Sequence, residues 1–342
     1  MNRRPRGSRP SLRPLHWLTA VISAFLLSAC TKDAPLNFLH PEGPSAVESD
    51  RIWDLVFAIA VVVFVLVEGA LVFVLFRYRQ RSDKDAPRQV HGNTRLEIAW
   101  TIIPVLLLIG VAVPTVGGIV RQSAEPPADA LRIDVIGHQW WWEYRYPDED
   151  VITATDLHIP TGRAVYLSIT SGDVIHSFWV PKLAGKQDAV PGRINPLSMK
   201  ADRPGKYLGQ CAEYCGLSHA NMRLTVYAHD PADFDGWVEN QKAVPAVPGD
   251  PLAARGRQLF LEGKCAGCHT IEGTNAKGQT GPNMTHFASR TTFAGSMFEV
   301  TDENLRLWLE DPPGRKPGSK MPNLKLPEDD ILALVSFLQS LK

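Results

Sequence analysis

Two long apolar runs limit most strongly how this chain can fold. Residues 52–76 and 98–120 are almost wholly apolar, and each exceeds the roughly 20 residues that a helix needs to cross a bilayer. The segment between them is basic and contains Arg77, Arg79, Arg81, Lys84, Arg88 and Arg95. Because basic loops stay on the cytoplasmic side, we expect a two-pass hairpin in a bacterial inner membrane, with everything after residue 120 in the periplasm. The alternative is a pair of buried core helices.

The first 29 residues are typical of an export signal. Five arginines precede an apolar run, residues 15–29, that is short for a membrane span. The run ends in Leu27-Ser28-Ala29-Cys30, which looks like a bacterial lipoprotein signal. We therefore expect residues 1–29 to be removed and Cys30 to carry lipid. An ordinary signal peptide followed by a free Cys is the alternative.

Residues 211–222, with the sequence CAEYCGLSHANM, concentrate soft metal ligands. Thiolate, imidazole and thioether together favour copper, whereas structural zinc prefers Cys and His without Met. Cys211 and Cys215 could bridge two metal ions through their sulfurs. Cysteine pairs in an oxidising compartment also form disulfides, so this stretch alone leaves both interpretations open.

The sequence upstream favours copper. His176 lies in DVIHSFWVP (173–181), QDAVPGR (187–193) follows, and PGKYLGQ (204–210) leads into Cys211. Together these segments closely resemble the CuA domain of cytochrome c oxidase subunit II, over residues 45–240. In that family two coppers are bridged by two Cys and completed by two His, one Met and one Glu carbonyl. The resemblance implies the ligands His176, Cys211, Glu213 (through its carbonyl oxygen), Cys215, His219 and Met222.

The same resemblance implies three further roles. Trp140 matches an aromatic residue that is exposed over the copper site and takes electrons from a cytochrome c, although the family more often has Tyr at position 141. The Glu213 carboxylate matches a ligand of Mg²⁺ or Mn²⁺ at the interface with the catalytic subunit, and carboxylate oxygen suits that ion. Glu97, just before WTIIP, matches a residue at a proton-uptake entrance. For Glu97 the alternative is a carboxylate favoured by the helix dipole.

Residues 126–239 have the pattern of an all-β domain. Apolar residues alternate in 131–136, 164–169 and 222–227, which predicts short strands, and several such strands favour a β-sandwich or barrel. The resemblance specifies a cupredoxin-like sandwich. Five histidines lack companion ligands at useful spacing: His40, His91, His158, His229 and His286. His138 lies in a segment that resembles the family but need not bind metal. We expect all six to be structural or on the surface.

A Pro-rich segment, 240–250, predicts a linker to a second periplasmic domain, 251–342. This domain contains Cys265-Ala-Gly-Cys268-His269, the attachment motif of a c-type haem, with His269 as an axial ligand. A thioredoxin-like CxxC is the alternative, but it gives no reason for the adjacent His. Helical patterns around the motif, including 328–341, resemble an all-α class I cytochrome c. Met284, Met297 and Met321 compete as sixth ligand; the family pattern selects Met321, which precedes Pro.

The whole pattern resembles subunit II of a bacterial cytochrome c oxidase with a fused cytochrome c domain. Electrons would enter at the haem from a cytochrome c or a bc-type complex and pass near Trp140 to dinuclear copper. Subunits I and III would be the partners, with the O₂-reducing site in subunit I. A copper subunit of a nitric oxide reductase and a free-standing electron carrier are the alternatives. Acidic and basic residues balance at 36 each, so net charge indicates no nucleic-acid binding.

Overall fold

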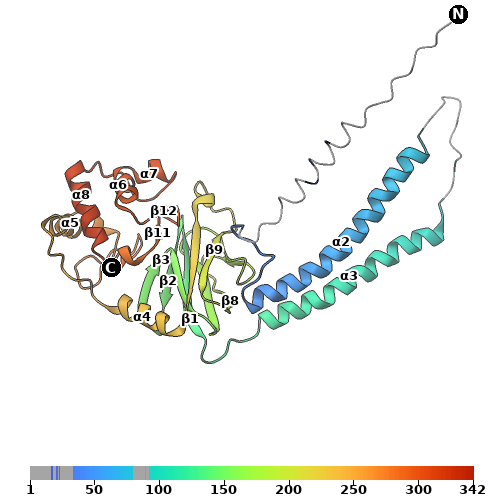
Figure 1. The fold of residues 1–342 in the computed structure, drawn as a ribbon, viewed down its shortest axis with the longest axis horizontal. Helices are drawn as coiled ribbons and strands as arrows, with labels where there is room; N and C mark the ends of the chain where they lie inside the picture. Colours follow the sequence, from blue (N-terminus) through green and yellow to red (C-terminus); the bar gives the residue numbers. More distant parts are fainter. Residues whose placement is uncertain (1–16, 18–20, 22, 24–33, 80–88, 90–91) are drawn as a thin grey trace, which may run out of the picture.

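The computed structural model describes residues 17, 21, 23, 34–79, 89 and 92–342. The predicted lipidation site, Cys30, lies outside these residues, as do most of the signal segment and most of the basic loop. Figure 1 shows two long helices side by side, a β-sandwich, and a C-terminal helical domain packed against the sandwich. The multidomain fold predicted from the sequence is therefore confirmed.

The two apolar runs form helices α2 (Pro44–Arg77) and α3 (Thr94–Gln122), both long and apolar enough to cross a membrane. Helix α2 begins before the predicted start at residue 52 because its first turn rests on the sandwich. There Ala46 is buried, and the Ser45 hydroxyl donates to the carbonyl of Ser198 at 3.1 Å. The Asn93 side chain caps α3 by accepting from the backbone N–H of the first helical turn.

An ion pair joins the two helices at the end nearest the sandwich. Glu48 of α2 contacts the guanidinium of Arg121 near the end of α3. The exposed apolar surface of both helices begins beyond this pair, as expected if charged groups stay outside the hydrocarbon. This ion pair joins the two helices at the same end where Ser45 contacts the sandwich.

The sandwich consists of two five-stranded sheets. The first sheet has the order β3-β2-β1-β5-β8 and the second β4-β10-β9-β6-β7. The strands are β1 (Leu131–His138), β2 (Trp141–Tyr146), β3 (Val151–Ala154), β4 (Asp156–Pro160), β5 (Val165–Ser171), β6 (His176–Trp179), β7 (Gln187–Ala189), β8 (Asn195–Met199), β9 (Gly205–Cys211) and β10 (Arg223–His229).

Alternating side chains from both sheets fill the core between them. In β1 the buried residues are Leu131, Ile133 and Val135, every second position, as the sequence pattern predicts. Strand β1 pairs in parallel with β5, and β10 in parallel with β4, while the other pairs are antiparallel. Both five-stranded sheets are therefore mixed.

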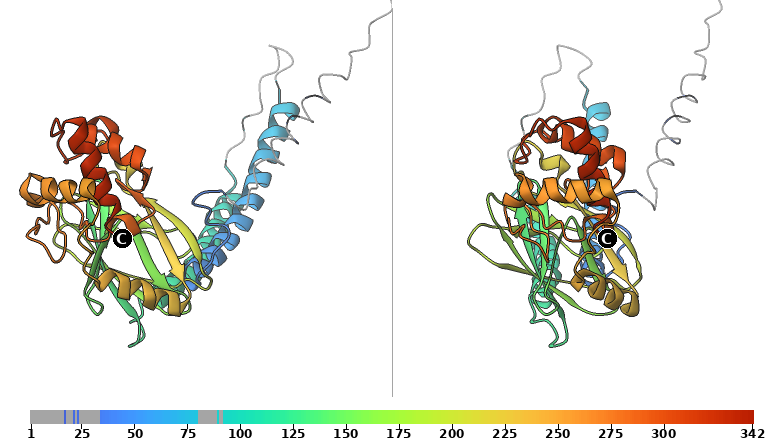
Figure 2. Two further views of the ribbon diagram at one scale, coloured as in Figure 1. Left: turned by 60° about the vertical axis from the view of Figure 1, so that its left-hand side comes forward. Right: turned by 90° about the vertical axis from the view of Figure 1, so that its left-hand side faces the viewer.

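Helix α4 (Pro231–Lys242) follows β10 and was not expected from the sequence. Its residues Phe234 and Val238 are buried in the sandwich core, and Trp237 stacks on His158 at 4.4 Å between ring centroids. Because α4 continues to Lys242, the first residues of the predicted linker 240–250 are helical. Figure 2 shows α4 lying along one end of the sandwich.

The C-terminal domain is built around two crossing helices, α5 (Pro251–Glu262) and α8 (Glu328–Gln339). Its other elements are η2 (Cys265–Gly267), η3 (Phe287–Ser289), β11 (Thr292–Phe293), β12 (Phe298–Glu299), α6 (Asp302–Glu310) and α7 (Pro312–Arg315). The β11–β12 hairpin is a small departure from the all-α domain expected. Helix α8 matches the predicted closing helix.

Buried polar contacts hold the C-terminal domain on the sandwich. Asp156, 1% exposed at the start of β4, accepts from the backbone N–H of Thr291 at 2.8 Å and from the hydroxyls of Thr291 and Thr292. Tyr227 shares a 2.6 Å hydrogen bond with the Thr291 hydroxyl. A buried carboxylate with three donors from another domain indicates a fixed interface rather than a loose encounter.

Candidate metal and haem sites

One strand end and the loop after it gather most of the predicted copper ligands. Strand β9 ends at Cys211, and the chain then turns so that Cys215 lies beside it, with 3.8 Å between the sulfurs. His219 Nδ1 is 3.6 Å from the Cys215 sulfur, and Met222 Sδ is 3.8 Å from it. The Glu213 carbonyl oxygen lies 3.3 Å from the Cys211 sulfur. The structure thus brings these five predicted residues together.

His176 reaches the same cluster from strand β6. Its Nδ1 lies 4.0 Å from the Cys211 sulfur, and its ligand atom and those of the two cysteines lie within 4.8 Å of one another. Its Nε2 donates to Asp173 at 2.8 Å. This bond fixes the ring so that Nδ1 faces the sulfurs. The second nitrogen of a metal-binding histidine is commonly held by a carboxylate in this way.

Asp173 is a site residue that sequence reasoning missed. Burial would raise its pKa, but hydrogen bonds from His176 and from the backbone N–H groups of Gln139 and Val174 hold that pKa well below the usual range. The carboxylate in turn raises the pKa of His176, against the lowering effect of burial. Asp173 could have been found from the sequence, because it lies three residues before His176.

The two thiols affect each other's protonation. The Cys215 side chain lowers the pKa of the Cys211 thiol, whereas contact with Cys211 and burial raise the pKa of Cys215. One proton therefore leaves the pair easily, and a metal ion bound to both sulfurs would displace the second. The site combines buried sulfur and imidazole donors, with a thioether beside them, and this donor set fits copper.

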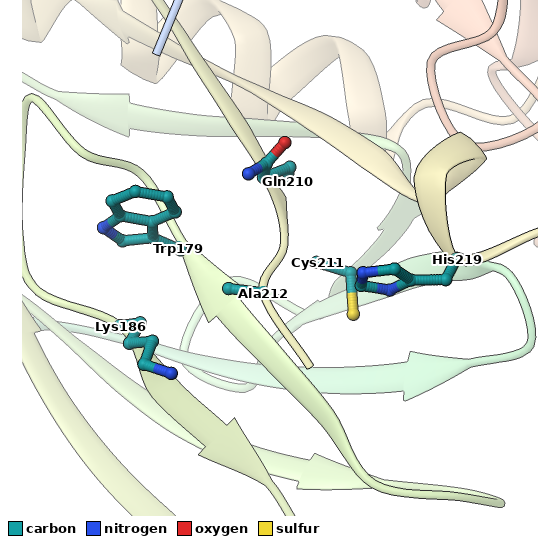
Figure 3. A pocket seen from close by; sticks show the side chains of 6 residues that line it. All are labelled: Trp179, Lys186, Gln210, Cys211, Ala212 and His219. Atoms are coloured by element: carbon teal, nitrogen blue, oxygen red, sulfur yellow. The ribbon is translucent and has the colours of Figure 1, made fainter. Parts of the chain in front are cut away.

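The cluster opens to the surface on one side. A hollow there is lined by Trp179, Lys186, Gln210, Cys211, Ala212 and His219. Figure 3 shows Cys211 and His219 toward one end of this hollow and Trp179 and Lys186 toward the other. Glu213 is exposed, so its carboxylate is free of the sandwich core and accessible to a partner.

A second cavity of about 500 Å³ lies between the sandwich and the C-terminal domain, and we call it the interdomain cavity. Its lining includes all four predicted haem-binding residues, Cys265, Cys268, His269 and Met321. His269 Nδ1 donates to the carbonyl of Pro282 at 2.8 Å, which leaves Nε2 as the nitrogen available to iron. The cavity has the size and apolar lining that a bound cofactor needs, so the residues fit a haem.

Two of the three competing methionines line this cavity. Met321 and Met284 do, whereas Met297 is not among the lining residues. Met321 Sδ lies 3.2 Å from the indole nitrogen of Trp308, which donates to it, whereas Met284 belongs to the apolar core of the domain. The geometry therefore favours Met321 over Met297 and leaves Met284 as its competitor.

Trp140 is buried, not exposed over the copper site as the sequence comparison led us to expect. Its side chain is 6% exposed because the C-terminal domain covers it. The indole Nε1 donates to the Cys215 carbonyl at 3.0 Å, and the ring also lines the interdomain cavity. Trp140 therefore touches both sites, but an external protein cannot reach it.

Lys316 is a second residue that the sequence did not single out. It is 3% exposed, and its ammonium donates to the carbonyls of Trp140, Asn221 and Ala294. Burial lowers the pKa of Lys316 to about 7, and the charge of Cys215 opposes this shift in part. Nothing in the sequence around position 316 indicates this contact.

Two histidines that we expected to lack companions form a pair. His158 Nδ1 and His229 Nε2 are 2.8 Å apart and share a hydrogen bond. Burial lowers the pKa of His158 to about 3, with a further contribution from His229. Among the described residues, no third metal-ligating side chain joins this pair.

Glu97 lies in the first turn of α3, as the sequence indicated. The turn is exposed, and the backbone carbonyl of Glu97 accepts from the Thr101 hydroxyl at 2.8 Å. Glu68, which lies within the first apolar run, is exposed on α2. Both carboxylates are open to a neighbouring protein at the helix surface.

Three family descriptions match the chain. These are Cytochrome C oxidase subunit II, transmembrane domain (residues 31–117), Cytochrome C oxidase subunit II, periplasmic domain (151–229), and Cytochrome c (253–342). The matches follow the order of the helix pair, the sandwich and the C-terminal domain.

Relatives match over nearly the whole chain. Cytochrome c oxidase subunit 2 of Alkalihalophilus pseudofirmus is 40% identical over 338 residues, covering 96% of each chain. That of Bacillus subtilis is 34% identical, covering 96% of this chain and 98% of its own. Among solved structures, the periplasmic domain of subunit II from Bradyrhizobium japonicum is 32% identical with a TM-score of 0.34, covering 34% of this chain and 97% of that one.

Proposed function

Because the chain belongs to the cytochrome c oxidase subunit II family, we propose that it is the electron-entry subunit of a bacterial terminal oxidase. The subunit II and cytochrome c domains imply copper and haem. A haem and a copper centre, when bound, would each accept and release single electrons. The residues of this chain would hold the two groups close together and insulate the connection between them from water.

We assign the copper ligands to six residues around the β9–β10 loop, as a dinuclear centre. Cys211 and Cys215 would bridge the metals, with His176, His219, Met222 and the Glu213 carbonyl completing the set. The buried sulfur–sulfur contact supports bridging, because both thiols face the same small volume. The sandwich keeps these donors in one place, so little reorganisation accompanies a change of charge.

We assign covalent haem attachment to Cys265 and Cys268, and axial ligation to His269 and Met321. The lining of the interdomain cavity supports this assignment. The bond from His269 to the Pro282 carbonyl would orient the imidazole, and the Trp308 indole would orient the Met321 sulfur. A His and Met pair raises the potential of a haem, as suits a donor to copper.

The position of Trp140 carries the proposal. The indole ring lines the interdomain cavity, and its N–H is bonded to the carbonyl of Cys215. This provides one short connection, through a single hydrogen bond, between the haem site and a copper ligand. Because Trp140 is buried, we place electron entry at the haem and Trp140 downstream of it.

The remaining assignments concern partners and orientation. The family implies association with other oxidase subunits in a membrane complex, and we propose subunits I and III, with a cytochrome c or bc-type complex as donor. The exposed Glu213 carboxylate would hold a Mg²⁺ against subunit I. Glu97 would serve proton uptake on the cytoplasmic side, and Cys30 would be lipidated. The sandwich and C-terminal domain would lie in the periplasm.

Oxygen and nitric oxide consumption test this function. The complex is purified through a tag on this chain, supplied with reduced cytochrome c, and offered O₂ or NO separately. We expect rapid O₂ uptake and a large haem subunit that copurifies. NO turnover without O₂ uptake would move the chain to a nitric oxide reductase. A lone chain with copper and haem but no turnover would be a free-standing carrier. The names of the full-length relatives favour the oxidase.

A further inference from the structure

A buried lysine lies where the two soluble domains meet. The Lys316 ammonium has three N–H donors, and the structure provides one carbonyl for each, at 2.6 Å (Trp140), 3.0 Å (Asn221) and 2.6 Å (Ala294). Lysine is almost never fully buried unless it is paired. Within the described residues no carboxylate forms an ion pair with Lys316, and its hydrogen-bond partners are these three carbonyls.

The three carbonyls come from three separate loops. Trp140 lies between β1 and β2, and Asn221 directly precedes the proposed copper ligand Met222. Ala294 belongs to the β11–β12 turn of the C-terminal domain. One side chain of the C-terminal domain thus binds two sandwich loops at the copper site.

Two glycine turns bring the C-terminal domain into direct contact with Trp140. Gly318 has φ +80°, and a Cβ there would lie 2.6 Å from Cη2 of the Trp140 ring. Gly295 has φ +74°, and a Cβ there would lie 2.7 Å from the Trp140 carbonyl oxygen. Such positions tolerate glycine because it lacks the side-chain atom that would clash. Trp140 is therefore enclosed by these turns on one side and bonded to Cys215 on the other.

We propose that Lys316 is a positioning residue for electron transfer within the chain, holding Trp140 between the interdomain cavity and Cys215. This inference rests on the proposed function. An apolar side chain at 316 would leave the buried carbonyl of Trp140 and the half-buried carbonyls of Asn221 and Ala294 without this donor, so the loops would separate to reach water. Trp140 would then lose its fixed place even though every proposed metal ligand is intact.

Two substitutions at position 316 test the proposal in the complete oxidase. The haem is reduced by a flash with an external photoreductant, and the rate of electron arrival at copper is followed from the absorbance of both centres. Lys316→Met should slow this rate several-fold, because Trp140 would no longer be held between the interdomain cavity and Cys215. Lys316→Gln, which retains two N–H donors, should lie between Lys316→Met and the parent.

The copper and haem spectra of all variants should match the parent. If Lys316 only stabilised the fold, its substitution would lower the yield of protein that contains copper and haem. The electron-transfer rates of the parent, Lys316→Gln and Lys316→Met would then not follow the number of N–H donors at position 316. Lys277→Met is the matched control, because Lys277 pairs with Glu272 on the surface of the same domain. Its rate should equal that of the parent. If Lys316→Met also transfers electrons at the parent rate, the inference is wrong while the proposed function stands.

Two further measurements keep the test decisive. Gly318→Ala introduces the clash with Trp140 without removing Lys316, and it should slow transfer even if Lys316→Met does not assemble. Hydrogen exchange on the chain before metal loading should be faster in residues 218–222 and 292–296 of Lys316→Met. An unchanged electron-transfer rate in Gly318→Ala, or unchanged hydrogen exchange in Lys316→Met, would overturn the proposal that Lys316 positions Trp140. Absence of haem-to-copper transfer in the parent would overturn the proposed function itself.

Discussion

In the copper site, five of the six proposed ligands come from one twelve-residue segment, whereas the haem site takes its walls from two domains. Neighbouring copper donors lie 3.3 to 4.0 Å apart. The proposed haem ligands His269 and Met321 come from distant parts of the C-terminal domain, and His138, Trp140 and Trp141 of the sandwich complete the cavity. The proposed copper ligands all belong to the sandwich, so that site can form without the C-terminal domain, while a site between two domains needs their docking.

The largest effect should come from removing a bridging thiol. In Cys215→Ser we expect copper to be lost and O₂ uptake to fall by more than about a hundredfold, because even outer partners of metal ligands are worth about 10- to 100-fold. The haem should stay attached, since Cys265 and Cys268 belong to the other site. Metal analysis and the haem absorbance spectrum measure both results. Loss of haem together with copper would show that the two sites depend on each other.

The next effect concerns the sixth haem ligand. Met321→Ala should leave the haem covalently attached but convert it from low spin to high spin and lower its potential. Met284→Leu is the matched control, because Met284 also lines the interdomain cavity and lies in the apolar core. The absorbance spectrum and a redox titration provide the measurements. A low-spin spectrum in Met321→Ala, with a changed one in Met284→Leu, would exchange the roles of the two residues.

This contrast explains what could be predicted from the sequence. The copper segment and the CxxCH motif are local, so the resemblance to known families, carried by short motifs, indicated residues that the structure brings together. Alternation of apolar residues likewise predicted β1, and apolar runs predicted α2 and α3. Each of these patterns depends on residues close in sequence, where the helix or strand period determines what faces the core.

The contacts between domains could not be predicted in this way. Lys316 and Trp140 are 176 positions apart, and Asp156 and Thr291 are 135 apart. The helix or strand period does not relate residues so far apart in sequence. A single lysine also gives no sequence motif from which its burial could be predicted. The expected exposure of Trp140 was wrong for the same reason, because burial by the C-terminal domain depends on docking. The His158–His229 pair similarly arises from the parallel pairing of β4 with β10.

A moderate effect on copper affinity should come from Asp173, which orients the proposed ligand His176 without binding copper itself. Asp173→Asn keeps the shape of the side chain but removes the charge that receives the His176 Nε2–H. We expect copper affinity to fall about 10- to 100-fold, with the centre still formed at saturating copper. Lys320→Met is the control, because it removes the 3.0 Å interdomain ion pair to Asp173 while leaving the bond to His176. Copper titration followed by absorbance distinguishes the two variants; equal affinity in both and the parent would remove Asp173 from the site.

The smallest effect concerns the stability of the sandwich at low pH, away from both sites. The folded-state pKa of His158 is lowered to about 3 by burial, below the ordinary value of 6.5. As the pH falls, His158 is protonated in the unfolded chain before it is protonated in the folded chain. The free energy of unfolding is therefore at its full value above pH 6.5 and decreases as the pH drops toward 3. At pH 5 this group should cost about 2 kcal/mol, from about 1.4 kcal/mol per pH unit. Thermal unfolding of the detergent-solubilised chain at pH 7 and pH 5 measures the change. The unfolding temperature of His158→Gln should depend less on pH than that of the parent. An equal pH dependence would assign the acid sensitivity to another group and leave the histidine pair as a packing contact only.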